Sequence, residues 1–591
     1  MKNIIFWKKF VKWRLNYTNN YYFLLFLSVL TGFGTGLAAV LLKNLVHSIQ
    51  KLVSNWSLFE NHNYLYFLFP IIGISIVVLF IKYILRQEVG DGVPKVLYAI
   101  SRNNAFIKAH NLFSSIISSA LTVGFGGSVG LEGPTVATGA AVGSNIGRVF
   151  KVAYRQKIIL LGAASAGAMA AIFKAPIAGV VFALEVIMID LTTQSIIPIL
   201  LAAASGSITS FLLMGTNVLY SFTLKANFML DQIPYFIVLG IITGFIAVYF
   251  TQVYTKISTI FSKIKGVYKK LLIGGGLLGV VIFIFPALYG EGYETINSAL
   301  RGDYSYLFES NIFNFNQESF LMLFILFLAM VLLKIIAASF TFGAGGIGGI
   351  FAPTLFTGVN TGLFLAVIFN HFGYDISPSN SALVGMAGLI AGVLQAPLTG
   401  IFLIGEITHG YGLLFPLMLT STISFITVRI FQKNNIYTIQ LARRKQLLTH
   451  HADKNTLTLI KMDSLIEDDF MPVKANDNLG ELIKTVAESS RNLFPVVDSD
   501  LTLLGIVDLN RIRKIMFKNE LHEKIKIREI MYVPEIVIEY EHEDPESIAE
   551  KLQKSGVFNI VVTHEGKYKG FISRANFFSH YRSLLKDFSA D

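Results

Sequence analysis

A single carboxylate, Glu132, interrupts the glycine-rich segment Gly126-Gly-Ser-Val-Gly-Leu-Glu-Gly-Pro-Thr135. It is the only formal charge between Lys108 and Arg148. A carboxylate at membrane depth costs about 3 kcal/mol on insertion scales and is therefore a functional candidate. The glycines permit a sharp turn and Pro134 suits the first turn of a helix, so the segment predicts a helix N-terminus whose free amides attract anions. We interpret Glu132 as a gate that can occupy this anion site or leave it.

Outside this segment the chain is strongly apolar. Of its 591 residues 53% are hydrophobic and 15% charged, and the mean hydropathy is +0.58; charged residues make up about 25% of an ordinary soluble protein. Apolar runs long enough to span a bilayer recur along the first three quarters, for example Tyr22–Leu42, Leu65–Ile81, Pro234–Phe250, Phe320–Ile336 and Leu413–Ile430. The composition predicts an all-α polytopic domain in a lipid bilayer, in which the 49 glycines suit closely packed and broken helices.

The net charge of +11 fits a membrane topology better than nucleic-acid binding. Basic residues cluster in Lys2–Arg14, Lys256–Lys270 and Arg443–Lys445, beside apolar runs, as cytoplasmic loops do. We therefore expect a bacterial plasma (inner) membrane protein with its N-terminus and its C-terminal part in the cytoplasm. The chain has no cysteine, which excludes disulfides, thiol nucleophiles and cysteine-ligated clusters.

The membrane part repeats internally. Gly130-Leu-Glu-Gly-Pro-Thr135 aligns with Gly349-Ile-Phe-Ala-Pro-Thr354, at a spacing of 351 − 132 = 219 residues. Ala175–Glu185 and Ala396–Glu406 share Ala-Pro-x-x-Gly and a final glutamate, at a spacing of 406 − 185 = 221 residues. Repeats of this size with interrupted helices are typical of transporters whose site lies at the repeat interface. The sequence alone leaves the relative orientation of the repeats open.

A third predicted helix start has the same pattern of glycines before a proline. Gly90-Asp-Gly-Val-Pro94 again places glycines directly before a proline, so Gly-rich starts fall near residues 92, 133 and 352. One such start is a weak signal because Gly-Pro punctuation is common, and turns that serve helix packing alone are the alternative. Irregular backbone is tolerated at membrane depth only inside protein or around a cavity, so three such starts favour an anion site.

The composition changes near Asn434, after which the chain is charged with short alternating apolar runs. We divide the chain into a cytoplasmic tail (1–17), a membrane domain (18–445) with repeats at about 20–215 and 232–432, a linker (446–461) and a soluble part (462–591). The soluble part is duplicated at about 462–518 and 525–591, because a helical stretch followed by strand, turn and strand occurs twice, with glycines 570 − 505 = 65 residues apart.

The soluble duplication resembles a tandem pair of CBS modules. In that family the segment Gly-apolar-x-Ser/Thr-x-x-Asp/Asn contacts an adenosine ribose and phosphate, and Gly570, Ser573 and Asn576 fit it. The first copy departs from it, with Asp508 and Arg511 at the matching positions. The resemblance implies an adenine nucleotide at one cleft, and a purely structural or dimerising pair is the alternative.

Together these segments resemble the CLC family of chloride channels and chloride/proton exchangers over nearly the whole chain. Gly130–Pro134 matches the family's G-x-E-G-P segment, whose glutamate is the external gate, and Gly349–Pro353 matches its G-x-F-x-P segment. Gly90–Pro94 matches its G-S-G-I-P segment, and Tyr437 matches the tyrosine whose hydroxyl binds the same anion. The resemblance implies a homodimer with one pore in each subunit, two inverted repeats of broken and tilted helices, and an anion site at Asp91, Gly92, Val93, Gly130, Leu131, Gly133, Ile350, Phe351, Ala352 and Tyr437.

Two positions depart from the family pattern. Asp91 replaces the serine of the first segment; because a charged carboxylate beside a bound anion is repelled strongly at low dielectric, we expect it to be protonated, turned towards Lys95 or solvated. Val186 occupies the position of the internal proton-transfer glutamate. The valine resembles the channel branch, although some exchangers also lack that glutamate. We expect Glu185 and Glu406 to cap exposed amides.

The sequence thus favours passive, gated permeation of chloride or another small anion, with no metal and no obligatory cofactor. The anion exchanges its water for backbone amides and the Tyr437 hydroxyl, and Glu132 leaves the outer position on protonation, anion occupancy or a change of voltage. A chloride/proton antiporter is the alternative within the family.

Two other classes fit less well. A CBS-regulated magnesium transporter needs several oxygen ligands, and the membrane part offers glycines and amides with few acids. An intramembrane serine protease would use Ser128 in Gly126-Gly-Ser-Val-Gly130, but His110 and His409 lie in no recognisable catalytic context. We therefore expect no enzyme activity.

Overall fold

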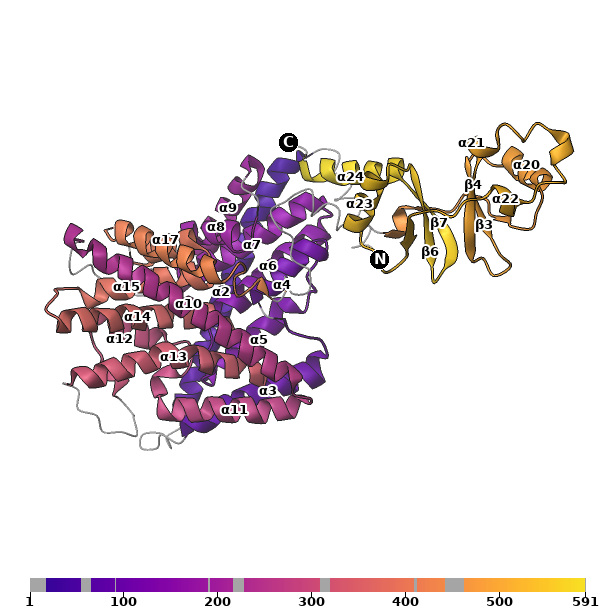
Figure 1. The fold of residues 1–591 in the computed structure, drawn as a ribbon. Helices are drawn as coiled ribbons and strands as arrows, with labels where there is room; N and C mark the ends of the chain where they lie inside the picture. The colour runs from indigo at the N-terminus through magenta and orange to yellow at the C-terminus, as the bar shows by residue number, and fades with distance from the viewer. Residues whose placement is uncertain are drawn as a thin grey trace. The chain divides into compact units, whose positions relative to one another are not determined.

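The structure is a computed structural model that describes residues 18–54, 65–90, 92–189, 192–215, 228–308, 319–408, 412–439, 441 and 462–589. The chain forms two compact units, residues 1–447 and 448–591 (Figure 1). The predicted tail (1–17), the predicted linker (446–461) and Asp91 lie outside the described residues.

The first unit is helical, and its helices fall into two series that follow the sequence repeat. The first series is α2 (Asn20–Ser54), α3 (Leu65–Leu79, continued by a π-helical turn to Leu85), α4 (Gly92–Arg102), α5 (Asn111–Gly124), α6 (Glu132–Val149), α7 (Tyr154–Phe173), α8 (Pro176–Glu185) and α9 (Thr193–Met214). The second series is α10 (Ile233–Lys263), α11 (Val267–Ile284), α12 (Tyr293–Arg301), α13 (Phe320–Ala344), α14 (Phe351–His371), α15 (Pro378–Val393), α16 (Pro397–Ile407) and α17 (Leu414–Phe431).

Long apolar helices dominate this unit. Within the described part of the chain, nine helices are long and apolar enough to cross a membrane. The apolar runs predicted to span fall within α2, α3 with its π-helical turn, α10, α13 and α17. Between the long helices lie shorter ones, such as α8 and α16, that cannot cross a bilayer alone. The prediction of a polytopic all-α domain with broken helices is confirmed.

Reciprocal contacts reveal how the two repeats are related. The Gly130 N–H donates to the Gly349 carbonyl at 2.8 Å, and the Gly349 N–H donates to the Gly130 carbonyl at 2.7 Å. The same exchange occurs at Thr122 and Thr341, each of which accepts a backbone N–H from the opposite repeat. Members of both pairs are 219 residues apart, which is the sequence spacing of the repeats. Equivalent residues contact each other reciprocally only around a twofold axis, so twofold symmetry relates the two repeats, which agrees with the inverted repeats that the family resemblance implies.

Helix packing obeys the same symmetry. In the first repeat α2 packs on α7 and α9, and in the second α10 packs on α15 and α17. The short helices α8 and α16 pack against each other across the repeats. In Figure 1 the helices α13, α14 and α15 of the second repeat lie side by side. The fold thereby brings the starts of α6 and α14 to its centre.

The second unit contains two small α/β modules. The first has a sheet in the order β2 (Val473–Lys474), β3 (Leu493–Val497) and β4 (Leu503–Asp508), with helices α20 (Leu479–Glu488), α21 (Leu509–Ile512) and α22 (Ile527–Ile530). The second has a sheet in the order β1 (Ile466–Glu467), β7 (Lys567–Ser573), β6 (Asn559–His564) and β5 (Val537–Glu539), with helices α23 (Pro545–Ser555) and α24 (Arg574–Ser589). Each module repeats a parallel pair followed by an antiparallel hairpin.

Strand exchange ties the two modules together. Strand β1, which precedes the first module, pairs with β7 of the second sheet. Tyr532, which precedes the second module, forms a bridge with Ile506 of the first sheet. The sequence predicted the two strand-turn-strand units and their helices, but it did not predict this exchange, because the exchanged segments are too short to give a periodic signal.

Candidate functional site

Three helix starts meet at the centre of the membrane unit. A Cβ atom at Gly92, the first residue of α4, would lie 2.8 Å from backbone atoms of Gly133 near the start of α6. A Cβ atom at Gly349, just before α14, would lie 2.7 Å from the Gly133 nitrogen. Only glycine permits such close backbone approach. The first N–H groups of a helix lack intrahelical acceptors and carry partial positive charge, so the three predicted starts converge on one electropositive point.

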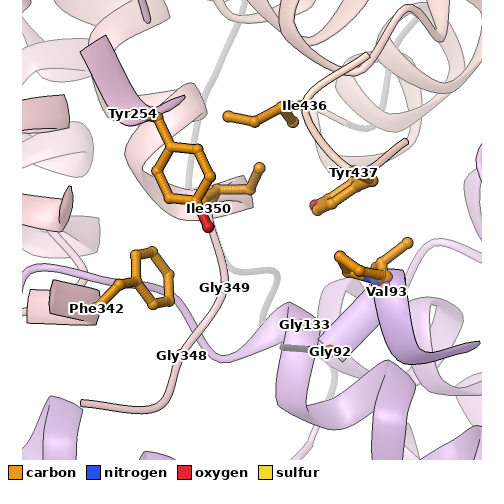
Figure 2. Close-up of a pocket in the computed structure, with 11 residues that line it drawn as sticks. Gly92, Val93, Gly133, Tyr254, Phe342, Gly348, Gly349, Ile350, Ile436 and Tyr437 are labelled. Carbon is orange, nitrogen blue, oxygen red and sulfur yellow. The ribbon is translucent and has the colours of Figure 1, made fainter. Parts of the chain in front are cut away.

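A small cavity lies at this meeting point (Figure 2). Its volume is about 20 Å³, on a scale on which one water needs about 10–15 Å³, so it has room for one small ion. Five residues predicted at the anion site line it: Gly92, Val93, Gly133, Ile350 and Tyr437. The structure therefore brings together residues from α4, α6, α14 and the segment after α17.

Aromatic side chains form much of the cavity wall. In Figure 2 Tyr254 and Phe342 lie on one side, and Tyr437 and Val93 lie on the other. Tyr437 is 6% exposed, and among the described residues its hydroxyl has no protein hydrogen-bond partner. A hydroxyl that donates into a cavity suits an anion. Tyr254 and Phe342 were not predicted, because aromatic residues within apolar helices carry no distinctive sequence signal.

Glu132 lies beside this cavity, at the start of α6. Its side chain is 1% exposed, and its Oε1 accepts a hydrogen bond from the Tyr293 hydroxyl. Oε2 makes no hydrogen bond of good geometry, but it lies against Gly130, and the amides of Glu132 and Ala352 are close enough to interact with the carboxylate. The gate candidate thus places its negative charge between the starts of α6 and α14.

A cluster of charged residues surrounds the gate. Lys43 on α2 donates to the Ile172 carbonyl near the end of α7 and interacts electrostatically with Glu132 and Glu291. Glu291, which is 9% exposed, also interacts with Lys334 on α13. From the sequence, Lys334 is a charge in an apolar setting that is expected to be solvated or paired, and its interaction with Glu291 agrees with pairing. The sequence reasoning missed Lys43 and Glu291, although Lys43 meets the criterion that identified Glu132, a lone charge in an apolar run.

Comparisons with known proteins assign the family. The family model described as voltage gated chloride channel matches residues 73–429, more than half of the chain. The chain belongs to the CLC family. A second model, for the CBS domain, matches residues 463–518. The chain is therefore a CLC anion transporter with a C-terminal CBS region, and the expectation of a transporter rather than an enzyme agrees with this family.

The relatives of this CLC protein include a protein named as an exchanger. The chain is 29% identical over 434 residues to the H+/Cl− exchange transporter ClcA of Vibrio cholerae, a match that covers 71% of this chain and 89% of the relative. Its fold is similar to that of a slow cyanobacterial Cl−/H+ antiporter, with a TM-score of 0.61, 24% identity and coverage of 72% and 98%. It is also similar to a eukaryotic CLC transporter, with a TM-score of 0.61, 19% identity and coverage of 94% and 99%.

The remaining described residues predicted from the CLC resemblance do not line the cavity. Gly130, Leu131 and Ala352 lie beside Glu132, and the ring of Phe351 contacts that of Phe173 with centroids 5.3 Å apart. Val186 is fully buried directly after α8. Because its side chain is a hydrocarbon, it offers no group that could carry a proton.

Glu185 and Glu406 cap each other's helices across the CLC repeats. Glu185, at the end of α8, accepts the Leu398 and Thr399 N–H groups of α16 at 3.0 and 2.7 Å. Glu406, near the end of α16, accepts the Ile177 and Ala178 N–H groups of α8 at 3.0 and 2.7 Å. The prediction that these two glutamates cap exposed amides is confirmed, and the pairing is a third reciprocal contact about the twofold axis.

We expect Glu406→Ala to destabilise the membrane unit. The substitution leaves two amides at the start of α8 without acceptors, and the unsatisfied donor of the buried Ala178 costs about 1–3 kcal/mol. Thermal unfolding in detergent should show a lower Tm, and Glu185→Ala should give a similar loss because its contacts are equivalent. Glu88→Ala, at an exposed position, is the control. Unchanged unfolding of both cap variants would contradict the role.

The polar residues of the candidate nucleotide cleft already have protein partners. The Ser573 hydroxyl donates to Glu467, and Asn576 donates from its amide side chain to the Leu465 carbonyl at 3.2 Å. Arg491 forms a salt bridge to Glu467 at 2.7 Å. A carboxylate therefore stands next to the hydroxyl that would contact a nucleotide, a feature that the motif did not predict.

The serine of the protease-like motif has a structural role. The Ser128 hydroxyl donates to the Leu288 carbonyl at 2.7 Å and is fully buried. His110 lies within 3.1 Å of the Ser114 hydroxyl instead, and His409 lies outside the described residues. Ser128 thus joins the gate segment to the turn before α12.

Proposed function

We propose that this CLC protein exchanges chloride for protons, with Glu132 serving both transport routes. The observation that carries the proposal is the position of the Glu132 carboxylate between the starts of α6 and α14, beside the cavity. A carboxylate in that position competes with an anion for the same electropositive point. When it takes up a proton it loses its charge and no longer excludes the anion, so the protonation of Glu132 and the binding of the anion are linked.

This proposal revises the preference for passive permeation that the sequence favoured. The relative ClcA named above is an H+/Cl− exchange transporter, which supports the antiporter alternative better. Val186 favours the channel, since a proton cannot pass inward through a buried valine. An exchanger of this sequence therefore needs another inner proton route, such as water or hydroxyl groups along the cavity that contains Tyr254 and Tyr437.

We propose the same assembly and location that the family resemblance implies. The protein would act as a homodimer, with one pathway for chloride or another small anion in each subunit, in a bacterial plasma membrane. The basic clusters beside the apolar runs support a cytoplasmic N-terminus and cytoplasmic CBS modules.

We also propose that the second CBS module binds an adenine nucleotide weakly at Gly570, Ser573 and Asn576. Because Glu467 holds Ser573 and places a negative charge at the cleft, Glu467→Gln should tighten ATP binding by about tenfold. Calorimetric titration of the full-length protein measures this, with Ser573→Ala expected to weaken binding. Absent binding in all three proteins would indicate a purely structural module, and equal binding in all three would show that the nucleotide does not bind at Ser573.

The exchange proposal is tested by coupled transport. Full-length protein in proteoliposomes is given an outward chloride gradient with the external pH above the internal pH, and external pH is followed. Exchange predicts inward proton movement against the proton gradient, which a protonophore abolishes. Chloride loss without any proton movement would establish the passive channel. It would also show that Val186, at the position of the proton-transfer glutamate, marks the absence of an inner proton route.

A further inference from the structure

A turn between α11 and α12 is fixed to the gate segment. The Ser128 hydroxyl and the Lys334 ammonium both donate to the Leu288 carbonyl, at 2.7 and 3.3 Å. Lys334 also donates to the Gly290 carbonyl at 3.0 Å, and the Gly290 N–H donates to the Gly126 carbonyl at 3.1 Å. Contacts from both the gate segment and α13 therefore hold this turn in one position.

The residue that follows this turn, Tyr293, points its side chain towards the gate. Gly292, with φ +85°, is a left-handed residue directly before α12, and a Cβ atom there would lie 2.6 Å from the Phe356 ring. The backbone thus enters α12 in a conformation that favours glycine. Tyr293 is the first residue of α12, and its hydroxyl reaches Glu132 Oε1.

We propose that Tyr293 is a positioning residue that latches the Glu132 carboxylate in its pathway-closing position. The proposal rests on the assignment of Glu132 as the gate and adds the group that holds the gate shut. A hydrogen bond to a charged acceptor is roughly twice as strong as a neutral one. Protonation of Glu132 therefore weakens the latch at the moment when the carboxyl group must leave the anion pathway.

Other groups near Glu132 do not provide this hydrogen bond. Lys43 on α2, Glu291 in the turn and Tyr437 after α17 interact with it electrostatically, and Lys334 on α13 faces Glu291. Within the described part of the chain, the side-chain hydrogen bond to the gate carboxylate comes from Tyr293. Its hydroxyl can be removed without changing the number of formal charges in the cluster.

The test is Tyr293→Phe in the full-length protein, measured as chloride flux from proteoliposomes across a pH series. Without the hydroxyl the deprotonated gate is held less firmly, so flux at alkaline pH should rise about tenfold, or ~1.4 kcal/mol, and the pH profile should flatten. Tyr306→Phe is the matched control, because that tyrosine hydroxyl also donates to a polar side chain of the membrane unit, Asn360 on α14, but does not touch the gate. Its pH profile should match that of the parent.

A double variant separates the latch from a general packing effect. In a Glu132→Gln background Tyr293→Phe should change flux little, because the charged acceptor is already gone. Equal effects of Tyr293→Phe in both backgrounds, or a parental pH profile in the single variant, would overturn the latch. If instead Glu132→Gln itself leaves the pH dependence intact, the gate assignment and the proposed function fail first, whatever Tyr293→Phe does.

Discussion

Glu132→Gln is expected to abolish proton transport while chloride transport continues. Glutamine keeps the size of the side chain but can neither take up a proton nor carry the charge that competes with an anion for the starts of α6 and α14. Chloride flux in proteoliposomes should become independent of external pH, and proton movement under a chloride gradient should fall to the level of empty liposomes.

A neighbouring carboxylate provides the control for this variant. Glu294 lies one residue after Tyr293 on α12 and is exposed, so Glu294→Gln should leave both fluxes unchanged. Proton transport that survives in Glu132→Gln, with its usual pH dependence, would show that the gate lies elsewhere.

Gly92→Ala should have the second large effect, on anion transport itself. The added Cβ would lie 2.8 Å from three backbone atoms of Gly133, and the residue has φ +27°, so neither the space nor the backbone conformation suits alanine. Overpacking costs about 1–3 kcal/mol, and relief requires the starts of α4 and α6 to move apart, which disrupts the cavity. We expect chloride flux to fall by about tenfold or more.

Gly276→Ala is the matched glycine control. A Cβ at this position in α11 would meet no atom within 4 Å, and alanine is the better helix former, so folding and flux should be unchanged or slightly improved. The two purified variants should be compared by gel filtration before the flux measurement. Equal chloride fluxes in Gly92→Ala and the parent would show that the close approach of α4 and α6 does not shape the pathway.

The parts of the fold that follow repeated patterns could be predicted from the sequence. Apolar runs predicted the long helices, and the spacing of 219 residues anticipated the reciprocal pair Gly130 and Gly349. The lone charge of Glu132 identified the gate candidate, because burying a carboxylate is costly in free energy and such a residue is therefore expected to be functional. The twofold symmetry of the repeats became visible only through contacts, since sequence similarity does not show how two segments pack against each other.

The environment of the gate could not be predicted in the same way. Lys43 on α2 and the pair Glu291 and Tyr293 before and at the start of α12 reach Glu132 from two distant segments, and only tertiary folding places them together. The choice between a channel and an exchanger was also beyond the sequence, because Val186 reports on the inner proton route and not on the gate. Exchange depends on how the protonation of Glu132 is linked to anion binding. This linkage depends on all the charged residues around Glu132.

The most direct test of the account is the reversal potential of the purified protein under crossed chloride and proton gradients. Coupled exchange through Glu132 predicts a potential that shifts with the proton gradient at constant chloride, and this shift should disappear in Glu132→Gln. A potential that equals the chloride equilibrium value at every pH, in the parent as in the variant, would contradict the account and identify a passive anion channel.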